Sequence, residues 1–364
     1  MIQLGIIGCG DVAMRTYIPA LEHLTDRAQV VATFDPIEER AQQAATHFSG
    51  ATAYTTYADL LNHTGLTGVF NLTPAPFHRD TTTAALDKGL HVFTEKPIAA
   101  SIEDARALIA HAKERDRLLL SAPAVMATVR FRWLKKIVDA GRLGRLTLAT
   151  AQMANMGPAG WRAYTGDPAV FYAANVGPVL DIGVYSLHAI TGLFGPAKRV
   201  QAMGAITIPE RNVLIPRLAG QKITVGAKDH MLIQLDFGGA FAQILASFAV
   251  PASKAPALEI HGTNGTVSVS MDQWYNAQGP VDVMLRDDTL LGIQGWTNGV
   301  GSPEGTGPAG DHLIGAGPEH FVACLRGEEQ PILTPEHATH VLEIILKSEQ
   351  AANEGRALEL ETSF

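Results

Sequence analysis

Residues 4–21, LGIIGCGDVAMRTYIPAL, decide how the first third of the chain folds. A short apolar run ends at Gly8 and Gly10, and Ala13 follows at the start of a helical pattern, which is G-x-G-x-x-A between a strand and a helix. Gly8 permits a tight turn, Gly10 lets the backbone approach a pyrophosphate, and Ala13 allows the helix to pack closely on the strand. Free N–H groups at the helix start suit an anion. The stretch therefore predicts a dinucleotide-binding turn.

An acidic residue at the end of the second apolar run supports this prediction. Asp35 lies 22 residues after Ala13, in VVATFDP. A carboxylate at this place can accept both hydroxyls of an adenine ribose, and it would repel a 2′-phosphate. We therefore expect NAD as the cofactor, with NADP less favoured.

Strand and helix patterns alternate through the first 120 residues. The apolar runs are residues 3–8, 29–34, 68–72, 90–94 and 117–121. Helical patterns separate them, and the pattern over 101–115 opens with a capping box from Ser101 to Asp104. Fully apolar strands that alternate with helices are typical of a parallel sheet covered on both faces. We predict an α/β Rossmann domain that binds NAD(P) over residues 1–122.

Longer strands and hairpin signals follow. Residues 230–248 alternate apolar and polar positions around a Gly238–Gly239 turn, and residues 257–271 do the same around Asn264–Gly265. A helix is expected over 335–355, and the Gly- and Pro-rich stretch 296–312 predicts a long surface loop or lid. Residues 123–364 are thus predicted to form an α+β domain with a large, mainly antiparallel open sheet, which serves substrate binding and oligomerisation.

Bulk properties narrow the class of protein. Of the 364 residues, 46% are hydrophobic and 18% are charged, and the net charge is −8. No run of lysines or arginines invites nucleic acid or an anionic membrane, and no apolar stretch is long enough for a membrane span. The N-terminal residues lack a signal-peptide pattern, and Cys9 and Cys324 suit neither a disulfide framework nor a metal site. We expect a cytoplasmic protein with no metal.

Seven short motifs, in order along the chain, resemble the Gfo/Idh/MocA oxidoreductases. They are GIIGCGDVA (5–13), FDPIEERA (34–41), NLTPAPFHRD (71–80), TEKP (94–97), AGRLGRL (140–146), GWRAY (160–164) and GPVLDIGVYSLH (177–188). The EKP triplet is the signature of that family. The resemblance implies a Rossmann domain that holds NAD(P), a second domain whose sheet carries the substrate site and often the oligomer interface, and pyranose, polyol or similar hydroxyl substrates.

The resemblance also implies a set of cofactor-binding residues and a role for one lysine. The cofactor set is Gly8, Gly10, Asp11, Val12, Asp35, Thr73, Pro74, His78, Glu95, Lys96 and Arg162. In the family, the lysine matched by Lys96 hydrogen-bonds the reacting hydroxyl beside the nicotinamide, and the proline matched by Pro97 helps to fix the local backbone. A proline also disfavours the α region for the residue before it, so Lys96 is expected to be extended. A strand end with two solvated charges is the ordinary alternative.

Residues 177–196 predict a helix with three polar side chains on one face. Asp181, Tyr185 and His188 lie at i, i+4 and i+7. A tyrosine is a poor base at neutral pH, but a lysine ammonium beside it stabilises the phenolate. We therefore predict Lys96, Asp181 and Tyr185 as catalytic, with His188 added to them for substrate binding. The ordinary alternatives are that Asp181 favours the helix dipole, that Tyr185 is an amphipathic edge residue, and that His188 is a semi-buried imidazole with its hydrogen bonds satisfied.

A Trp-Arg pair precedes this helix, as it does in the family. Trp161 and Arg162 are expected near the nicotinamide end or the substrate, with Trp161 among the substrate-binding residues. The aromatic residues Trp161, Tyr164, Phe171 and Tyr172 suit stacking on a sugar ring, or they form a loop core. Two departures from the family, Asn175–Gly177 in place of a glycine triplet and the apolar stretch 122–133, leave the substrate open.

The predicted function is hydride transfer between NAD(H) and a hydroxyl or carbonyl of a sugar, polyol or glycoside. Two alternatives stay open: hydrolysis of a glycoside through transient oxidation with tightly held NAD, and a non-catalytic NAD sensor on the same fold. The second half of the chain has too few helical segments to cover both faces of a broad sheet. We therefore expect a homodimer or, from the resemblance, a homotetramer.

Overall fold

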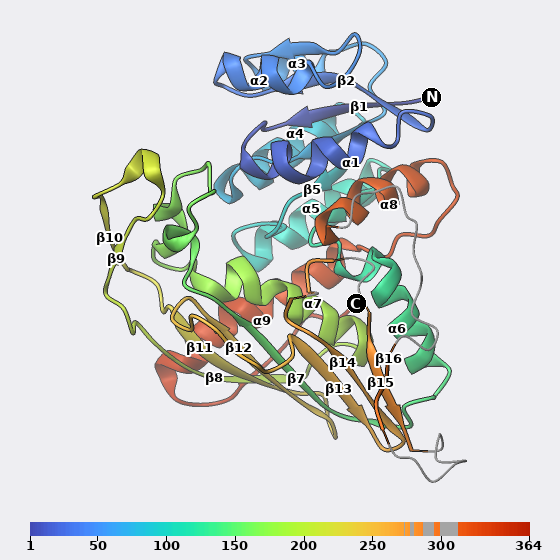
Figure 1. Ribbon diagram of the computed structural model, residues 1–364. Coiled ribbons are helices and arrows are strands. Elements are labelled where there is room, and N and C mark those ends of the chain that lie inside the picture. The colour runs from blue at the N-terminus through green and yellow to red at the C-terminus, as the bar shows by residue number, and fades with distance from the viewer. Residues whose placement is uncertain (273, 277–279, 287–294, 299–311) are drawn as a thin grey trace. The chain divides into compact units, whose positions relative to one another are not determined.

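The chain forms two compact units (Figure 1). The computed structural model describes residues 1–272, 274–276, 280–286, 295–298 and 312–364. The first unit comprises Met1–Thr128 and Thr306–Leu342, and the second comprises Val129–Gly305 and Glu343–Phe364. Most of the loop predicted over 296–312 lies outside the described residues. Within the described ranges, no helix combines the length and the apolar character that crossing a bilayer requires.

The first unit contains a parallel six-stranded sheet in the order β3-β2-β1-β4-β5-β6. Its strands are β1 (Ile2–Ile7), β2 (Ala28–Phe34), β3 (Thr52–Tyr54), β4 (Gly68–Asn71), β5 (His91–Thr94) and β6 (Leu119–Ser121). This is the strand order of the dinucleotide-binding doubly wound fold, and the predicted Rossmann fold is confirmed. Sequence reasoning missed β3, because it has only three residues and none of them is fully buried.

Helices connect these strands, and a helix from the second segment of the unit packs into its core. They are η1, a π-helix (Ala13–Tyr17), α1 (Ile18–Glu22), α2 (Glu38–Ala45), α3 (Tyr57–Leu61), η2 (Ala75–Phe77), α4 (His78–Asp87), α5 (Ile102–Glu114), η3 (Val125–Ala127), η8 (Leu313–Gly315) and α8 (Ala316–Leu325). The Ser101 hydroxyl accepts the Asp104 N–H, as the capping box predicted. Phe321 of α8 packs edge-on against Phe70 and Phe93, at ring distances of 5.2 and 5.9 Å.

The second unit contains a nine-stranded sheet among the described residues, in the order β16-β15-β14-β13-β7-β12-β11-β8-β17. The strands are β7 (Leu146–Ala154), β8 (Arg199–Ala205), β11 (His230–Asp236), β12 (Phe241–Ser247), β13 (Leu258–Gly262), β14 (Gly265–Val269), β15 (Asp282–Leu285), β16 (Thr297–Asn298) and β17 (Leu358–Glu359). Only the β7–β12 pair is parallel. Both predicted hairpins are present, as β11–β12 and β13–β14, and the mainly antiparallel open sheet is confirmed.

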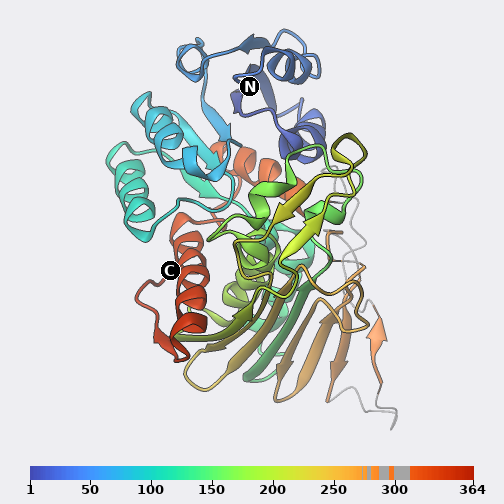
Figure 2. The same cartoon turned by 90° about the vertical axis from the view of Figure 1, so that its left-hand side faces the viewer.

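Helices of the second unit lie on one side of this sheet (Figure 2). They are α6 (Val129–Asp139), the π-helix η6 (Val179–Gly183), α7 (Val184–Phe194) and the last turns of α9 (Pro335–Glu354), which begins in the first unit. The helix α7 contacts β7 and β12, and α6 contacts α7. Side chains on this side of the strands, such as Ile233 and Ile244, are fully buried.

A small flap joins the sheet to the loop that follows β7. The flap consists of β9 (Glu210–Asn212), η7 (Pro216–Leu218) and β10 (Lys222–Thr224), and the loop contains η4 (Pro158–Gly160) and η5 (Pro168–Tyr172). The Leu214 N–H donates to the Ala159 carbonyl at 2.8 Å, and the Gly226 N–H donates to the Tyr172 carbonyl at 2.8 Å. These bonds tie the flap and the loop into one substructure.

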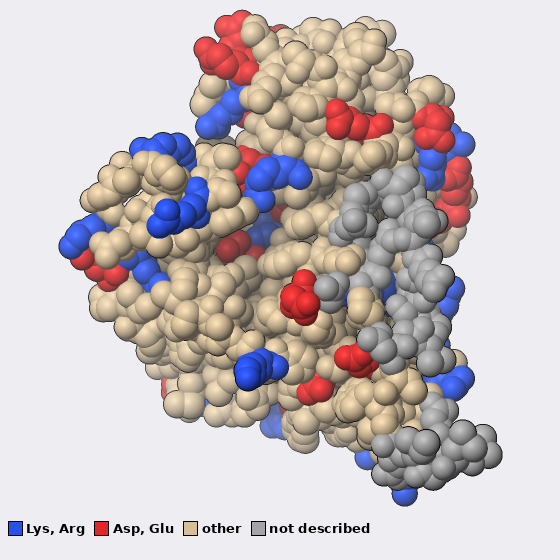
Figure 3. Space-filling model, in the orientation of Figure 1, with Lys and Arg blue, Asp and Glu red and all other residues tan. Residues whose placement is uncertain are grey.

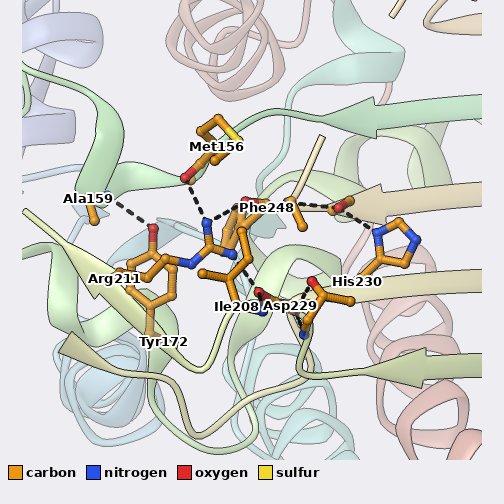
Figure 4. A network of polar contacts seen from close by, with 12 residues as sticks. Met156, Ala159, Tyr172, Ile208, Arg211, Asp229, His230 and Phe248 are labelled. Carbon is orange, nitrogen blue, oxygen red and sulfur yellow. Dashed lines mark hydrogen bonds and ion pairs between the residues drawn. The ribbon is translucent and has the colours of Figure 1, made fainter. Parts of the chain in front are cut away.

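The buried Arg211 side chain joins the flap to the loop and to the sheet (Figure 4). Its guanidinium pairs with the buried Asp229 carboxylate, donates to the Phe248 carbonyl at 2.7 Å and to the Met156 carbonyl at 3.4 Å, and lies 5.5 Å from the Tyr172 ring centre. The Tyr172 hydroxyl in turn accepts the Ala159 N–H at 3.1 Å. One buried cation thus reaches the sheet and both ends of the loop.

The Asp229 carboxylate is stabilised by more than its ion pair. It also accepts the N–H groups of Thr207 and Ile208, at 2.6 and 3.1 Å. Burial raises the pKa of the Asp229 carboxyl, but the hydrogen bonds from Thr207, Arg211 and Ile208 outweigh this and hold the pKa below its usual range. A depressed pKa in the folded protein means that the ionised form contributes stability above the unfolded value of ~3.9.

Removing either partner should therefore destabilise the second unit. Arg211→Met leaves a buried carboxylate without its cation, and we expect a loss of about 3–5 kcal/mol in the free energy of unfolding by urea denaturation. As pH falls below about 4, the wild type should lose the Asp229 contribution, and Asp229→Asn should lack this acid-dependent part. Lys222→Met, which breaks the exposed Lys222–Glu210 pair on the same flap, is the control and should cost less than about 1 kcal/mol.

Candidate functional site

The turn after β1 has the geometry that a dinucleotide requires. Gly8 has a φ of 95°, and a Cβ on this residue would lie 2.8 Å from the carbonyl carbon and oxygen of Leu72. A Cβ on Gly10 would meet no atom within 4 Å, so the space beside it is open, and Ala13 is fully buried against the sheet. The turn leaves room for a pyrophosphate at the start of η1, and the residues present fit the predicted cofactor.

The helix after this turn begins differently from the prediction. Asp11 and Val12 are α-helical, the π-helix η1 follows over Ala13–Tyr17, and α1 then continues. π segments of this kind are frequent at functional sites. The Asp11 carboxylate accepts from the Arg15 Nε at 2.6 Å, so the acid beside the helix start is neutralised by its own helix. The Val12 carbonyl accepts the Thr16 hydroxyl. The segment η8 packs against η1, a contact that sequence reasoning missed.

Asp35 lies directly beside the glycine turn. Its two carboxylate oxygens accept the N–H groups of Cys9 and Ile37, each at 3.0 Å, and the residue is 5% exposed. Each oxygen keeps a further lone pair that a ribose hydroxyl could use. Burial and then the charge of Asp35 raise the pKa of the Cys9 thiol to about 12, so Cys9 is a protonated packing residue. Asp35 thus joins the end of β2 to the turn after β1.

The loop after β4 is held by a buried histidine. The Thr73 N–H and hydroxyl both donate to the Asn71 Oδ1, at 3.3 and 2.7 Å, and Pro74 follows in an extended conformation. His78 is only 1% exposed, and its two ring nitrogens lie 2.7 Å from the Thr73 carbonyl oxygen and 2.6 Å from the Pro97 carbonyl oxygen. The histidine therefore contacts both this loop and the loop that contains Lys96.

The loop after β5 places Lys96 between two fixed neighbours. The Glu95 carboxylate is buried, and it accepts the Tyr17 hydroxyl at 2.7 Å and the Lys96 N–H at 2.9 Å. The peptide bond from Lys96 to Pro97 is cis. Because β1, β4 and β5 are adjacent parallel strands, their carboxyl ends bring the glycine turn, Thr73 and Lys96 to the same edge of the sheet. Lys96 itself is half-buried.

In the second unit, the predicted helix contains a wide turn. Asp181 lies in the π-helix η6 and is half-buried, while Tyr185 and His188 lie on α7 and are 7% and 4% exposed. The predicted helix is present, but the π turn holds more than 3.6 residues. The α-helical spacing that suggested one shared face therefore does not apply between Asp181 and Tyr185.

Tyr275 joins this group, and sequence reasoning missed it. Its ring lies 5.8 Å from the Tyr185 ring, edge to face at 80°. The surrounding protein and then the Asp181 carboxylate raise the pKa of Tyr275, although part of its side chain reaches the surface. The phenol consequently stays protonated at neutral pH and can donate a hydrogen bond. Nothing in the local sequence marks this residue, because its proximity to Asp181 and Tyr185 comes from the fold.

The loop between β7 and η6 presents an aromatic surface. Trp161 is 43% exposed and its ring lies 5.6 Å from that of Tyr164, which in turn contacts Phe171 at 5.8 Å. Arg162 is exposed beside them. Tyr172 is not part of this surface, since it is buried against Phe248 and Arg211. Of the predicted aromatic cluster, Trp161 is exposed, Tyr164 and Phe171 are half-buried, and Tyr172 is in the interior.

The predicted catalytic residues divide between the two units. Lys96 belongs to the first unit, whereas Asp181 and Tyr185 belong to the second. The second unit also has an open groove of about 780 Å³, which contains none of the predicted site residues. It is lined by Ser253–Pro256, Glu259, Ser268, Ser270–Asp272, Asp282 and Trp296. On the face shown in Figure 3, acidic and basic side chains of the described residues are interspersed over a largely uncharged surface.

Comparisons with known proteins agree with the fold and the glycine turn. Residues 2–122 match a model described as an oxidoreductase family with an NAD-binding Rossmann fold, and residues 131–268 match the GFO/IDH/MocA C-terminal domain. The chain is 30% identical, over 65% of its length, to 68% of the dTDP-3,4-didehydro-2,6-dideoxy-alpha-D-glucose 3-reductase of Actinomadura kijaniata. It is 26% identical, over 92% of its length, to 99% of the 1,5-anhydro-D-fructose reductase of Ensifer adhaerens.

A solved structure extends the likeness of the fold to the whole chain. Levoglucosan dehydrogenase in complex with NADH and levoglucosan superimposes with a TM-score of 0.83 over 99% of this chain and 100% of that one, at 19% identity. The matched models cover both the Rossmann unit and most of the large sheet. Together with the glycine turn and the EKP triplet, they establish that the chain belongs to the Gfo/Idh/MocA family of NAD-binding oxidoreductases.

Proposed function

We propose that the protein transfers a hydride between NAD(H) and a hydroxyl or carbonyl carbon of a sugar, polyol or glycoside. The observation that carries this proposal is the placement of Lys96, which follows β5 at the sheet edge that also holds the glycine turn and Asp35. Similarity to reductases of a deoxysugar nucleotide and of anhydrofructose supports the substrate class. In this proposal residues 1–122 bind NAD, and residues 123–364 bind substrate and form the oligomer.

The proposed chemistry divides a proton and a hydride between two acceptors. The nicotinamide ring of bound NAD supplies the hydride acceptor or donor. The Lys96 ammonium hydrogen-bonds and polarises the reacting oxygen. The Tyr185 phenolate takes the proton in the oxidation, and the Tyr185 hydroxyl returns it in the reduction. Asp181 orients a neighbouring hydroxyl of the substrate. Tyr275, protonated next to Asp181, can donate a further hydrogen bond there.

The remaining predicted residues receive supporting roles in this proposal. Gly8, Gly10, Asp11 and Val12 form the turn for the pyrophosphate, and Thr73, Pro74, Glu95 and Arg162 complete the cofactor site. The predicted cofactor residue His78 is buried, so its role is to hold the Thr73 and Pro97 carbonyls. The aromatic surface of the exposed Trp161 and the half-buried Tyr164 and Phe171 suits the apolar face of a sugar ring. His188 is buried on α7, so a role in substrate binding requires contact at one edge of its ring.

The open side of the large sheet supports an oligomer. Gln201, Gln234, Gln243 and Thr150 form one row across four adjacent strands. Met203 and Phe241, in neighbouring rows, are 74% and 57% exposed, and no helix among the described residues covers this side. Amide side chains donate and accept hydrogen bonds equally, so the row is complementary to a second copy of itself. We propose that this surface forms a homodimer interface, alone or within a homotetramer.

The cofactor preference can be measured by titration. Because the Asp35 carboxylate would repel a 2′-phosphate, NAD should bind more tightly than NADP to the wild type. Asp35→Ala should narrow the gap by weakening NAD more than NADP. The same change also removes bonds to Cys9 and Ile37, so Asp35→Asn, which keeps a hydrogen-bond acceptor without the charge, is the matched variant. Tighter binding of NADP than NAD by the wild type would contradict this assignment.

The catalytic role of Lys96 can be tested with a panel of sugars and polyols that is followed by NADH absorbance. Lys96→Ala should keep NAD binding and lose about two to four orders of magnitude in turnover. Lys96→Arg should restore little, because a planar fork does not replace a compact ammonium. Tyr185→Phe should also lose activity, and the double variant should lose little more.

Three outcomes of that panel separate the proposed function from its alternatives. A folded, NAD-bound Lys96→Ala protein within about threefold of wild-type turnover would show that the assigned role is wrong. Sugar release from glycosides without accumulation of NADH would indicate hydrolysis through transient oxidation. Tight NAD binding with no chemical change in any substrate would indicate a sensor.

The oligomer can be tested by light scattering over a range of concentrations. A charge within the proposed interface, as in Phe241→Glu, would be buried against the second copy and should lower the mass toward that of a monomer at micromolar concentration. Leu346→Glu, an exposed leucine on α9, is the control and should leave the mass unchanged. A wild-type protein with the mass of a monomer at every concentration would contradict the proposed interface.

A further inference from the structure

One buried imidazole lies between the two loops at the functional edge of the Rossmann sheet. His78 begins α4, between the loop after β4 and the loop after β5. Its Nε2 is 2.7 Å from the Thr73 carbonyl oxygen, and its Nδ1 is 2.6 Å from the Pro97 carbonyl oxygen. Asn71 also holds this region, because its side-chain amide donates to the His78 carbonyl at 3.2 Å. The ring is therefore a direct link between the two loops.

Both partners of the His78 ring are hydrogen-bond acceptors, so the ring must be the donor. Carbonyl oxygens only accept, so each contact requires a proton on the facing ring nitrogen. The neutral ring can donate to one carbonyl, and the protonated ring can donate to both. Burial lowers the pKa of His78, while its bonds to Pro97 and Thr73 and the charge of Glu95 oppose this lowering. A buried carbonyl that loses its donor would cost about 1–3 kcal/mol.

The link has a specific consequence for Lys96. The Lys96 N–H is held by the Glu95 carboxylate, which in turn is held by the Tyr17 hydroxyl. The carbonyl of the next residue, Pro97, is held by His78. The backbone on both sides of Lys96 is thus bound by buried side chains, and the lysine has little freedom except along its own side chain.

We propose that His78 is a positioning residue for Lys96. It holds the backbone of Lys96 and Pro97 at a set distance from Thr73, so that the loop after β5 and the loop after β4 keep their relative position. With 1% of its surface exposed, the ring acts on bound ligands through these two carbonyls and not through contact of its own. This proposal rests on the proposed function, in which Lys96 polarises the reacting oxygen.

His78→Gln is the informative variant, because its amide keeps a donor for one carbonyl but replaces the rigid ring that spans the two carbonyls with a flexible side chain. We expect kcat to fall about 10- to 100-fold, the loss typical of a small misplacement of a catalytic group. The dissociation constant for NAD, measured by titration, should change less than about fivefold, since the glycine turn and Asp35 hold the other end of the cofactor. His78→Leu, with no donor, should lose more than His78→Gln, so the amide gives partial rescue.

His320→Gln provides a matched control in the same unit. His320 is equally buried, and its ring contacts Glu329 at 2.7 Å and accepts the Ile332 N–H at 3.0 Å, away from Lys96. Loss of thermal stability in this variant should resemble that of His78→Gln, while its kcat should stay near the wild-type value. Equal losses of kcat in both variants would show that burial alone explains the effect and would overturn the proposal.

A double variant separates a failure of this proposal from a failure of the proposed function. If His78 acts through Lys96, adding His78→Gln to Lys96→Ala should change kcat by less than about threefold. Additive losses overturn the positioning role. If Lys96→Ala alone retains wild-type turnover, the role assigned to Lys96 fails instead, and if the wild type oxidises or reduces no sugar or polyol, the proposed function fails.

A measurement without turnover tests the same link. Hydrogen exchange of the peptide that contains Lys96, followed by mass spectrometry, should be at least about tenfold faster in His78→Gln and unchanged in His320→Gln, because the first variant releases the backbone beside Lys96. Unchanged exchange in His78→Gln would overturn the proposal even where activity is lost.

Discussion

The close approach of Gly8 to the end of β4 is the constraint on which the functional edge of the first unit depends. Because a Cβ at this position would collide with the Leu72 carbonyl, only a glycine lets β1 turn there with a φ of 95°. The turn brings the Cys9 N–H onto Asp35 at the end of β2. The loops after β4 and β5 then meet at the same edge, and His78 joins them. The glycine turn, Asp35, Thr73 and Lys96 are thus joined by hydrogen bonds at one edge of the sheet.

Local patterns predicted the parts of the fold that depend on local physics. Apolar runs marked five of the six parallel strands, and glycine turns marked both hairpins of the large sheet. Asp35 was singled out because it directly follows a buried strand, and Lys96 because it lies in the EKP triplet. The roles of both residues stay predictions. Residues that depend on contacts between distant segments could not be found: Tyr275 meets Tyr185 across 90 positions, and Arg211 reaches Asp229 and Phe248 from a short flap. The division of function between 1–122 and 123–364 stays a prediction.

The two units hold their functional segments in different ways. In the first unit, buried side chains bind backbone atoms next to Thr73 and Lys96, so precision comes from the main chain. In the second unit, a buried ion pair holds the loop that displays the exposed Trp161, whose ring packs on that of Tyr164. The main-chain contacts around Lys96 and the side-chain contacts around Trp161 are thus two different ways to hold a loop, and each is described within its own unit.

The π segment η6 makes the relation between Asp181 and Tyr185 depend on chain length. A π turn is an α-helical turn that has accommodated an extra residue. Deleting one residue from Val179–Gly183 would let the segment close as an ordinary α-helix, and because the wide turn only absorbs the extra residue, the chain on either side would keep nearly its present orientation. Asp181 lies inside the turn, so its own place relative to Tyr185 would change while the segments around it would not. In this helix a single codon, gained or lost, moves one carboxylate and leaves the rest of the unit where it is.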